Sequence, residues 1–291
     1  MSETQTHRLA GMAAMLAGVA SFSLMDAGLK LLSGHYPPMQ VAALRGLSAL
    51  PLVFTWAMYS GGPKQLVNVR WRLHLIRGAL SVIMMVSFVI GIQQMSLAKT
   101  YALFFVAPLL IAILSVFMLG ERVHRAQWVA IAIGFAGVLF VRPPEIVGWI
   151  APLAVLGTAL CYALSSILVK IIGRTDSTQS MVFWMTCMLA IGATTLTFLL
   201  PAGWQALHRE HYLLIGGVAV TGAVGQWGIT KAFKHAPAAS VAPLEYSGMA
   251  WVILIDLFVW SVTPEWQTLV GAAVIIGSGL YLLRFESRRS S

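Results

Sequence analysis

Residues Ala98–Leu119 read AKTYALFFVAPLLIAILSVFML, a stretch of 22 residues in which Lys99 is the only charged side chain. A helix needs about 20 mostly apolar residues to cross the hydrocarbon core of a bilayer. The apolar residues follow one another without the alternation that marks the strands of a transmembrane barrel. The stretch therefore predicts a membrane-spanning helix and excludes an outer-membrane barrel.

The composition of the whole chain agrees with this prediction. Of its 291 residues 58% are hydrophobic and 10% are charged, whereas a soluble protein carries about 25% charged residues. The net charge of +9 does not indicate a nucleic-acid partner, because membrane proteins concentrate lysine and arginine in their cytoplasmic loops. Cys161 and Cys187 lie within apolar runs, so we interpret them as buried small side chains and not as a disulfide. We expect an all-α integral membrane protein that has the lipid bilayer as a partner.

Polar breaks and breaks that contain proline or glycine divide the chain into ten candidate spans. The first continues to Leu32, beyond the apolar region of a cleaved signal peptide, so we expect it to be retained as an anchor. In chain order the spans are Leu9–Leu32, Met39–Tyr59, Leu75–Ile92, Ala98–Leu119, Gln127–Val141, Trp149–Ile172, Ser180–Leu200, Tyr212–Thr230, Ala238–Val262 and Thr268–Leu283.

The positive charges orient these spans. If both termini are cytoplasmic, fourteen of the nineteen lysines and arginines face the inside and Arg45 lies within a span. Only Lys30, Lys99, Arg142 and Arg209 then face the outside. Cytoplasmic loops carry an excess of Lys and Arg, so the sorting supports ten helices with both termini inside.

The two halves of the chain repeat each other at offsets of 140 and 141 residues. The aligned residues include Leu16, Leu24 and Lys30 with Leu156, Leu164 and Lys170, and Ala98, Leu103 and Phe117 with Ala239, Leu244 and Phe258. The seam lies near Arg142-Pro143-Pro144. An odd number of spans per copy makes the second copy enter the membrane upside down. Inverted repeats of this kind form secondary transporters with a solute site between the repeats near the midplane. The alternative is a duplicated membrane scaffold without transport.

A signature at the end of the fourth span carries a family resemblance. The segment Pro108–Arg122 closes on Leu119-Gly120-Glu121-Arg122 and is followed by Trp128 and Gly137, and Leu44-Arg45-Gly46 occurs in the second span. These residues resemble the EamA-like branch of the drug/metabolite transporter superfamily. The second copy departs from the pattern, with Met249 in place of the proline and Val262 in place of the glutamate.

The resemblance covers both halves, and we expect one EamA-like repeat at residues 8–142 and another at 149–284. It implies a carrier of small metabolites with a central cavity between the repeats, and it places the fifth and tenth helices outside that cavity. It also favours export, and it implies no cofactor. Gly120 and Glu121 enter the candidate site as residues of the family signature.

Ionisable side chains inside a bilayer are costly, and they mark functional sites by default. Asp26 and Arg45 lie nine residues on either side of the turn at His35 and Tyr36, so both are expected at one height in the outer half. Lys231 and Glu245 are each seven residues from Ala238, at one height in the inner half. We therefore predict two ion pairs that act as outer and inner gates.

Other interpretations of these charges stay open. Each pair can equally be structural, and Asp26 can instead pair with Lys30 one turn along its own helix. Asp256 lies eleven residues after Glu245, about three turns of helix, so both acids point from one face of the ninth span. That face either lines a wet path that carries coupling protons, or Asp256 reaches the outer interface.

Aromatic and amide side chains supply the candidates for the solute pocket. Stacking or cation–π contact with a flat or cationic metabolite is expected from these residues, although ordinary helix packing explains any one of them. Gln226 is the uncharged polar candidate, because a buried amide requires partners. Small residues four apart, such as Ala130 and Gly134 or Ala273 and Gly277, allow close helix packing or a homodimer through the fifth and tenth helices. The pocket candidates are Tyr101, Tyr162, Trp184, Gln226, Trp227 and Trp251.

Several function classes are excluded. The chain lacks a G-x-x-x-x-G-K-[ST] phosphate loop and is therefore no ATP-driven pump. It has no metal-ligand motif such as H-E-x-x-H, which a membrane protease of that class requires, so we predict no metal site and no enzyme. We expect an alternating-access carrier of small organic metabolites in the bacterial inner membrane, an exporter that is proton-coupled. Metabolite or vitamin uptake and lipid flipping are the alternatives, and an integral-membrane enzyme is the rival class.

Overall fold

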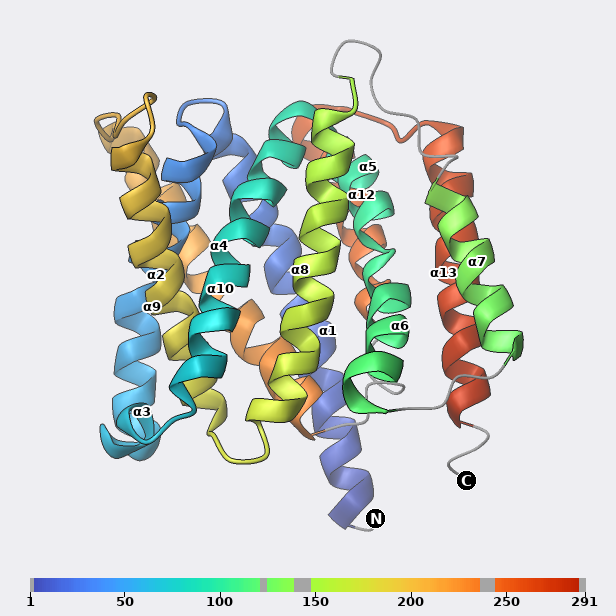
Figure 1. Cartoon of the computed structure of the whole chain (residues 1–291). Coiled ribbons are helices and arrows are strands. Elements are labelled where there is room, and N and C mark those ends of the chain that lie inside the picture. The colour runs from blue at the N-terminus through green and yellow to red at the C-terminus, as the bar shows by residue number, and fades with distance from the viewer. Residues whose placement is uncertain (1–2, 121–124, 139–147, 236–243, 288–291) are drawn as a thin grey trace.

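The computed structural model describes residues 3–120, 125–138, 148–235 and 244–287. All secondary structure within these ranges is helical, and the helices stand side by side as a bundle (Figure 1). The first half contains α1 (Glu3–Ser33), α2 (Pro38–Gly61), α3 (Lys64–Val67), α4 (Trp71–Gln94), α5 (Leu97–Phe104), α6 (Ala107–Leu119) and α7 (Arg125–Val138). The second contains α8 (Ile150–Ile172), α9 (Thr178–Leu199), the short η1 (Arg209–His211), α10 (Tyr212–His235), α12 (Gly248–Trp260) and α13 (Trp266–Ser287).

Seven helical segments of the described chain are long and apolar enough to cross a membrane, and shorter apolar helices follow at Gly248–Trp260 and Trp266–Ser278. The chain is thus an all-helical membrane protein. The fifth expected span, Gln127–Val141, corresponds to α7, which ends at Val138 where the described range stops. The ninth, Ala238–Val262, is represented by α12, and its first residues lie outside the described ranges.

The fourth span is not the continuous helix that its hydropathy predicts. Helix α5 ends at Phe104, Phe105 and Val106 form a turn, and α6 begins at Ala107. Pro108 explains the break, because proline lacks the N–H that would bond four residues back and its ring clashes with that carbonyl. A turn recurs 141 residues later, at Tyr246 and Ser247, directly before α12.

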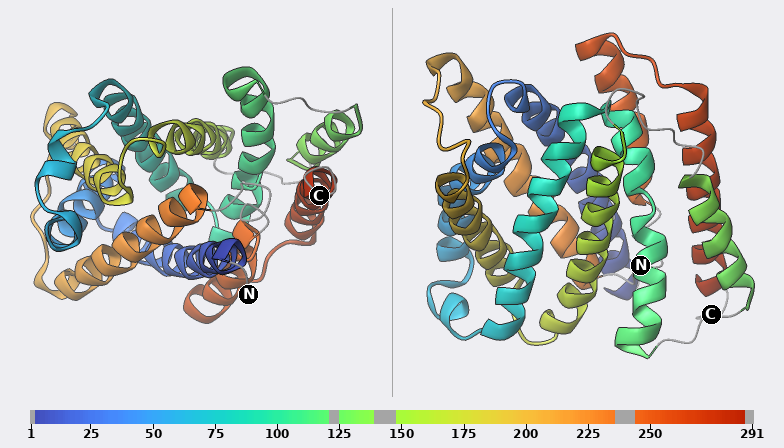
Figure 2. Two further views of the ribbon diagram at one scale, coloured as in Figure 1. Left: turned by 90° about the horizontal axis from the view of Figure 1, so that it is seen from below. Right: turned by 45° about the horizontal axis from the view of Figure 1, so that its top comes forward.

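Neighbours along the chain are not the main neighbours in space. Helix α1 packs along α10, and α2 packs along α9, as the view from below in Figure 2 shows. Small residues permit these contacts: a Cβ atom built on Gly46 would lie 2.6 Å from the backbone nitrogen of Ala190, and one on Gly228 would lie 2.5 Å from the carbonyl oxygen of Ala14. Helices of the first half therefore pack mainly against helices of the second half.

Helices α7 and α13 pack against each other at one side of the bundle (Figures 1 and 2). Gly137 of α7 faces Ile275 of α13, whereas Gly277 has nothing within 4 Å of an added Cβ atom. Gly134 and Gly137 of α7 thus serve contacts within the chain. A homodimer through these two helices stays a prediction.

Candidate functional site

A cavity of about 120 Å³ lies between the two halves of the chain. Its walls come from α1, α2, α4 and α5 on one side and from α8, α9, α10 and the segment before α12 on the other. An engineered apolar cavity of about 150 Å³ binds benzene, so the space is of the order of a single aromatic ring. Most of the wall is apolar, with the residues Phe22, Phe88, Phe104, Phe105, Phe233, Met25, Met84, Met85 and Met185.

Asp26 of α1 lies in this wall and is 5% exposed. The Tyr101 hydroxyl of α5 donates a hydrogen bond to Asp26 Oδ2 over 2.6 Å. Arg45 of α2 also lines the cavity, where its guanidinium lies 5.7 Å from the centre of the Phe22 ring and its Nε donates to Met25 Sδ over 3.1 Å. An acid and a cation thus share one region of the wall.

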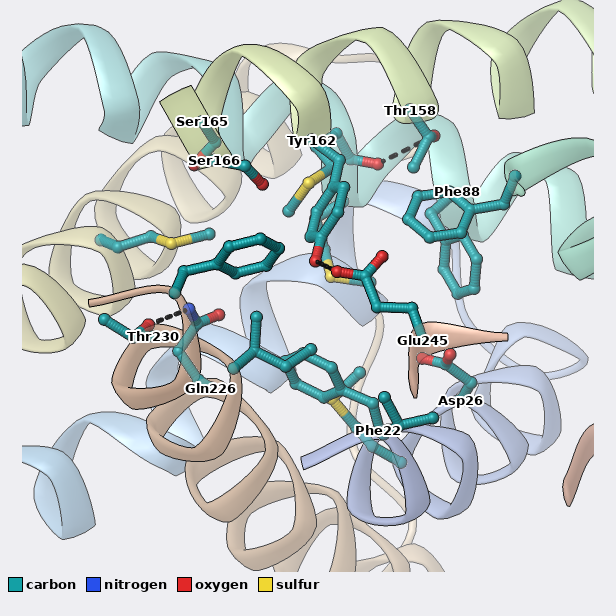
Figure 3. A pocket seen from close by; sticks show the side chains of 18 of the residues that line it. Phe22, Asp26, Phe88, Thr158, Tyr162, Ser165, Ser166, Gln226, Thr230 and Glu245 are labelled. Carbon is teal, nitrogen blue, oxygen red and sulfur yellow. Dashed lines mark hydrogen bonds between the residues drawn. The ribbon is translucent and has the colours of Figure 1, made fainter. Parts of the chain in front are cut away.

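Glu245 is the corresponding acid from the second half. It is 6% exposed, and its Oε1 accepts a hydrogen bond of 2.8 Å from the Tyr162 hydroxyl of α8 (Figure 3). The roles are exchanged between the halves. In the first half, the acid Asp26 is on α1 and the tyrosine Tyr101 is on α5. In the second half, the tyrosine Tyr162 is on the first helix, α8, and the acid Glu245 directly precedes the turn before α12.

Neither predicted pair, Asp26 with Arg45 or Lys231 with Glu245, forms a direct salt bridge. Among the described residues, salt bridges join His74 to Asp176 and Lys99 to Glu265, and neither Asp26 nor Glu245 takes part in one. The pairs were predicted because their members lie at the same height in the membrane. However, α1 packs mainly on α10 and α2 mainly on α9, and the two make few contacts with each other. Tyrosines from other helices are therefore the hydrogen-bond partners of both acids.

Lys231 and Asp256 lie outside the cavity wall. The Lys231 Nζ atom lies 4.7 Å from the centre of the Trp227 ring. Asp256 accepts hydrogen bonds from the backbone N–H groups of Leu97, at 3.2 Å, and Ala98, at 2.7 Å. It caps the N-terminus of α5, where helix N–H groups lack partners and a negative charge is favourable. Asp256 therefore does not share the cavity wall with Glu245, and its carboxylate is buried at the start of α5.

Three of the six pocket candidates line the cavity: Tyr101, Tyr162 and Gln226. The Gln226 side chain donates to the Thr230 hydroxyl over 3.1 Å (Figure 3). Trp184 instead donates its Nε1–H to the Leu66 carbonyl, and Trp251 is 45% exposed on the outer surface of the bundle. Trp227 lies next to Lys231 and is likewise not part of the wall.

Arg77 of α4 is a site residue that the sequence reasoning missed. It is 3% exposed, lines the cavity, and donates to the Ser165 hydroxyl and the Met181 carbonyl. The sequence predicts a third span at Leu75–Ile92, which places Arg77 near its inner end with the charges of the cytoplasmic side. The helix begins four residues earlier, at Trp71. An arginine within the predicted span Leu75–Ile92 is the sequence signal that identifies it, because a charge inside a span is costly.

Gly120, the family-signature residue that the structure describes, lies away from the cavity. Gly120 ends α6 in the left-handed conformation, with φ of 70°, and its N–H bonds to the Ser115 carbonyl. Glycine adopts such a cap without steric cost, which explains the residue. Glu121 lies outside the described residues. In the described part of the chain, no group of three or more His, Cys, Asp or Glu side chains is placed to hold a metal ion.

Comparison with known proteins gives consistent matches over the whole length. The EamA-like transporter family matches residues 9–142 and 149–284. The chain is 28% identical to a riboflavin transporter of Vibrio cholerae over 98% of this chain and 96% of that protein. It is 25% identical to an S-adenosylmethionine uptake transporter of Rickettsia felis over 100% of this chain and 98% of that protein. It is 26% identical to the pseudopaline exporter CntI of Pseudomonas aeruginosa over 93% of this chain and 95% of that protein.

A solved structure shares the fold. A crystal structure superposes with a TM-score of 0.69 at 17% identity, over 97% of this chain and 99% of the other. The family match and the relatives make the chain a multi-pass membrane transporter of small metabolites and not an enzyme.

Proposed function

We propose that this chain, which belongs to the EamA-like transporter family, is a ten-helix secondary carrier of the bacterial inner membrane with two inverted five-helix repeats. The arrangement of the helices supports the inversion. Helices α1 and α8 open the two halves and start from opposite ends of the bundle (Figure 1). The turns at Phe105–Val106 and Tyr246–Ser247 also recur at equivalent places in the two halves. Such inverted repeats provide alternating access to one central site.

The cavity between the halves is the observation that carries this proposal. Each half contributes a buried acid that accepts a hydrogen bond from a tyrosine, namely Asp26 from Tyr101 and Glu245 from Tyr162. Arg45 and Arg77 add two cations to the same wall. Charged groups buried in a membrane protein belong to solute or ion pathways, so we assign solute binding and proton exchange to this wall.

The lining favours a solute with a flat or apolar body and at least one charged group. Phenylalanine and methionine side chains bury apolar surface and stack on rings, and the arginines and acids recognise charge of either sign. Two relatives are named for uptake and transport of metabolites that contain a ring system, riboflavin and S-adenosylmethionine, and a third is named as an exporter. We therefore propose export of a metabolite of this kind, with uptake as the alternative direction.

Counterflow in proteoliposomes tests the proposal. A thermal-shift screen against a metabolite library that includes riboflavin and S-adenosylmethionine selects the solute, because a ligand of the folded state raises apparent stability. We expect vesicles preloaded with that solute to accumulate its labelled form from outside, and Asp26→Ala together with Glu245→Ala to abolish this. No counterflow with any stabilising solute contradicts the carrier. Rates that do not respond to a pH gradient contradict proton coupling alone.

A further inference from the structure

Two loop residues at opposite ends of the bundle occupy equivalent places in the two halves. Tyr36 lies between α1 and α2, and Asp176 lies between α8 and α9, 140 residues later. Tyr36 is 3% exposed and Asp176 is 6% exposed. Neither residue lines the central cavity. Their burial within loops shows that each is held by contacts with other parts of the chain.

Asp176 binds the start of α4, which belongs to the other half. Its Oδ2 accepts a hydrogen bond of 3.1 Å from the backbone N–H of Arg70 and lies 2.9 Å from His74 Nε2. Burial by itself would raise the pKa of Asp176, but the hydrogen bonds from Thr175, His74 and the Arg70 amide outweigh it and lower the pKa below its ordinary value. The carboxyl group is therefore ionised at neutral pH and makes strong hydrogen bonds.

Tyr36 makes the corresponding contacts at the other end. Its hydroxyl oxygen accepts a hydrogen bond of 3.0 Å from the backbone N–H of His208, and it lies 2.8 Å from His211 Nδ1. These residues stand directly before α10, which is the third long helix of the second half as α4 is of the first. Gln40 adds two bonds beside it, donating to the Gln205 carbonyl and accepting from the Gln205 N–H.

The contacts of Tyr36 and Asp176 follow the same pattern in the two halves. In each, the residue in the first hairpin loop of one half accepts a backbone N–H that precedes the third helix of the other half. It also bonds a histidine three or four residues further on, which is His211 or His74. The side chains differ, a tyrosine and an aspartate, so the correspondence reflects the position in the repeat and not a copied residue.

We propose that Tyr36 with His208 and His211, and Asp176 with Arg70 and His74, are the two latches that close the outer and inner ends of the carrier. This inference rests on the proposed alternating access. The cavity lies between the halves, so it opens to one side only where the halves separate, and the latch at that end joins them directly. Opening the inner end breaks the Asp176 latch and leaves the Tyr36 latch formed, and opening the outer end does the reverse.

Cysteine labelling from each side tests the latches. Met85 in the middle of α4 lines the cavity and is replaced by cysteine after Cys161→Ala and Cys187→Ala have removed the two native cysteines. A membrane-impermeant maleimide is added to right-side-out and to inside-out vesicles. Tyr36→Phe and His211→Ala break the outer latch from its two sides, and Asp176→Ala and His74→Ala break the inner one. Arg174→Ala, an exposed neighbour of Asp176, is the matched control.

We expect the outer variants to raise the labelling rate several-fold from outside and to lower it from the cytoplasmic side. The inner variants are expected to do the opposite, and Arg174→Ala to leave both rates unchanged. Rates that change in the same direction from both sides, or that do not change, overturn the latches. Counterflow separates the two proposals. Opposite labelling shifts in the variants together with no counterflow by the unmodified chain count against the carrier. Intact counterflow in variants that show no labelling shifts counts against the latches.

Discussion

Tyr101 and Tyr162 each bind a carboxyl group from a different helix inside the cavity wall. Both hydrogen bonds are short, 2.6 Å to Asp26 and 2.8 Å to Glu245. In a buried site, a polar group that loses its hydrogen-bond partner costs more than the bond contributes when made. The tyrosines therefore hold the orientation of the two acids, and loss of either hydroxyl leaves a buried carboxyl group underbonded.

We predict that Tyr101→Phe and Tyr162→Phe each slow solute counterflow by about tenfold, since leaving a buried polar group without its hydrogen-bond partner costs about 1–3 kcal/mol. Tyr246→Phe is the matched control, because the Tyr246 hydroxyl is buried and has no hydrogen-bond partner among the described residues. Counterflow rates of the three variants at equal protein amounts check this. Equal loss in all three would contradict a specific role for the two pairs.

Asp176 gives a pH-dependent prediction. Its pKa is lowered in the folded chain, so its stabilising effect is complete above the unfolded value of about 3.9 and is lost as the pH falls through the folded value. We expect Asp176→Asn to lower the thermal midpoint at pH 7, and the difference from the unmodified chain to shrink below about pH 4. Thermal unfolding in detergent across this pH range measures it. A difference that is constant with pH would exclude ionisation as its origin.

At the scale of the helix, the broken fourth span and the turn before α12 meet. The rings of Phe105 and Tyr246, one from each turn, contact edge to face with centroids 5.1 Å apart. Pro108 breaks the first helix, whereas the second copy has Met249 at that place. There the Ser247 hydroxyl bonds the Leu244 carbonyl over 2.6 Å, and such side-chain bonding competes with the helical backbone. The equivalent turns therefore have different local causes, Pro108 in the first half and the Ser247 hydrogen bond in the second.

The packing of α1 on α10 gives the prediction for the helices. We expect Gly228→Ala to lower the free energy of unfolding by about 2 kcal/mol, because the added methyl group meets the backbone of α1 and overpacking costs about 1–3 kcal/mol. Gly216→Ala lies in the same helix with nothing within 4 Å, so it is expected to be neutral or slightly stabilising. The thermal midpoints of the two variants, each compared with that of the unmodified chain, measure this difference. Similar midpoints would mean that the contact tolerates the methyl group.

At the scale of the whole molecule, the charges and the helix count predict the topology. We predict ten spans with most lysines and arginines inside and both termini in the cytoplasm. We expect a green fluorescent protein fused after Ser291 to fluoresce and an alkaline phosphatase fused there to be inactive. The same reporters fused after Arg142, at the seam between the repeats, should behave in the opposite way. An active phosphatase at the C-terminus would contradict this topology.

The sequence by itself determined the membrane class, the approximate spans, the twofold repetition and the buried charges. The physical reason is that a bilayer forces every spanning backbone to satisfy its own hydrogen bonds, so length and hydropathy alone mark the helices. The repeat is visible because it preserves residue spacing. The same reasoning identified Asp26, Arg45, Tyr101, Tyr162, Gln226 and Glu245, all of which lie at the cavity.

Only the tertiary structure decided which groups meet. Position in a span gives the height of a side chain but neither the rotation of its helix nor the identity of the neighbouring helix. Because α1 packs on α10 and α2 on α9, the acids bind tyrosines instead of the expected cations. Asp256 likewise caps α5 from the other half of the chain. The contacts of Tyr36 and Asp176 join residues more than 100 positions apart, which no local pattern in the sequence specifies.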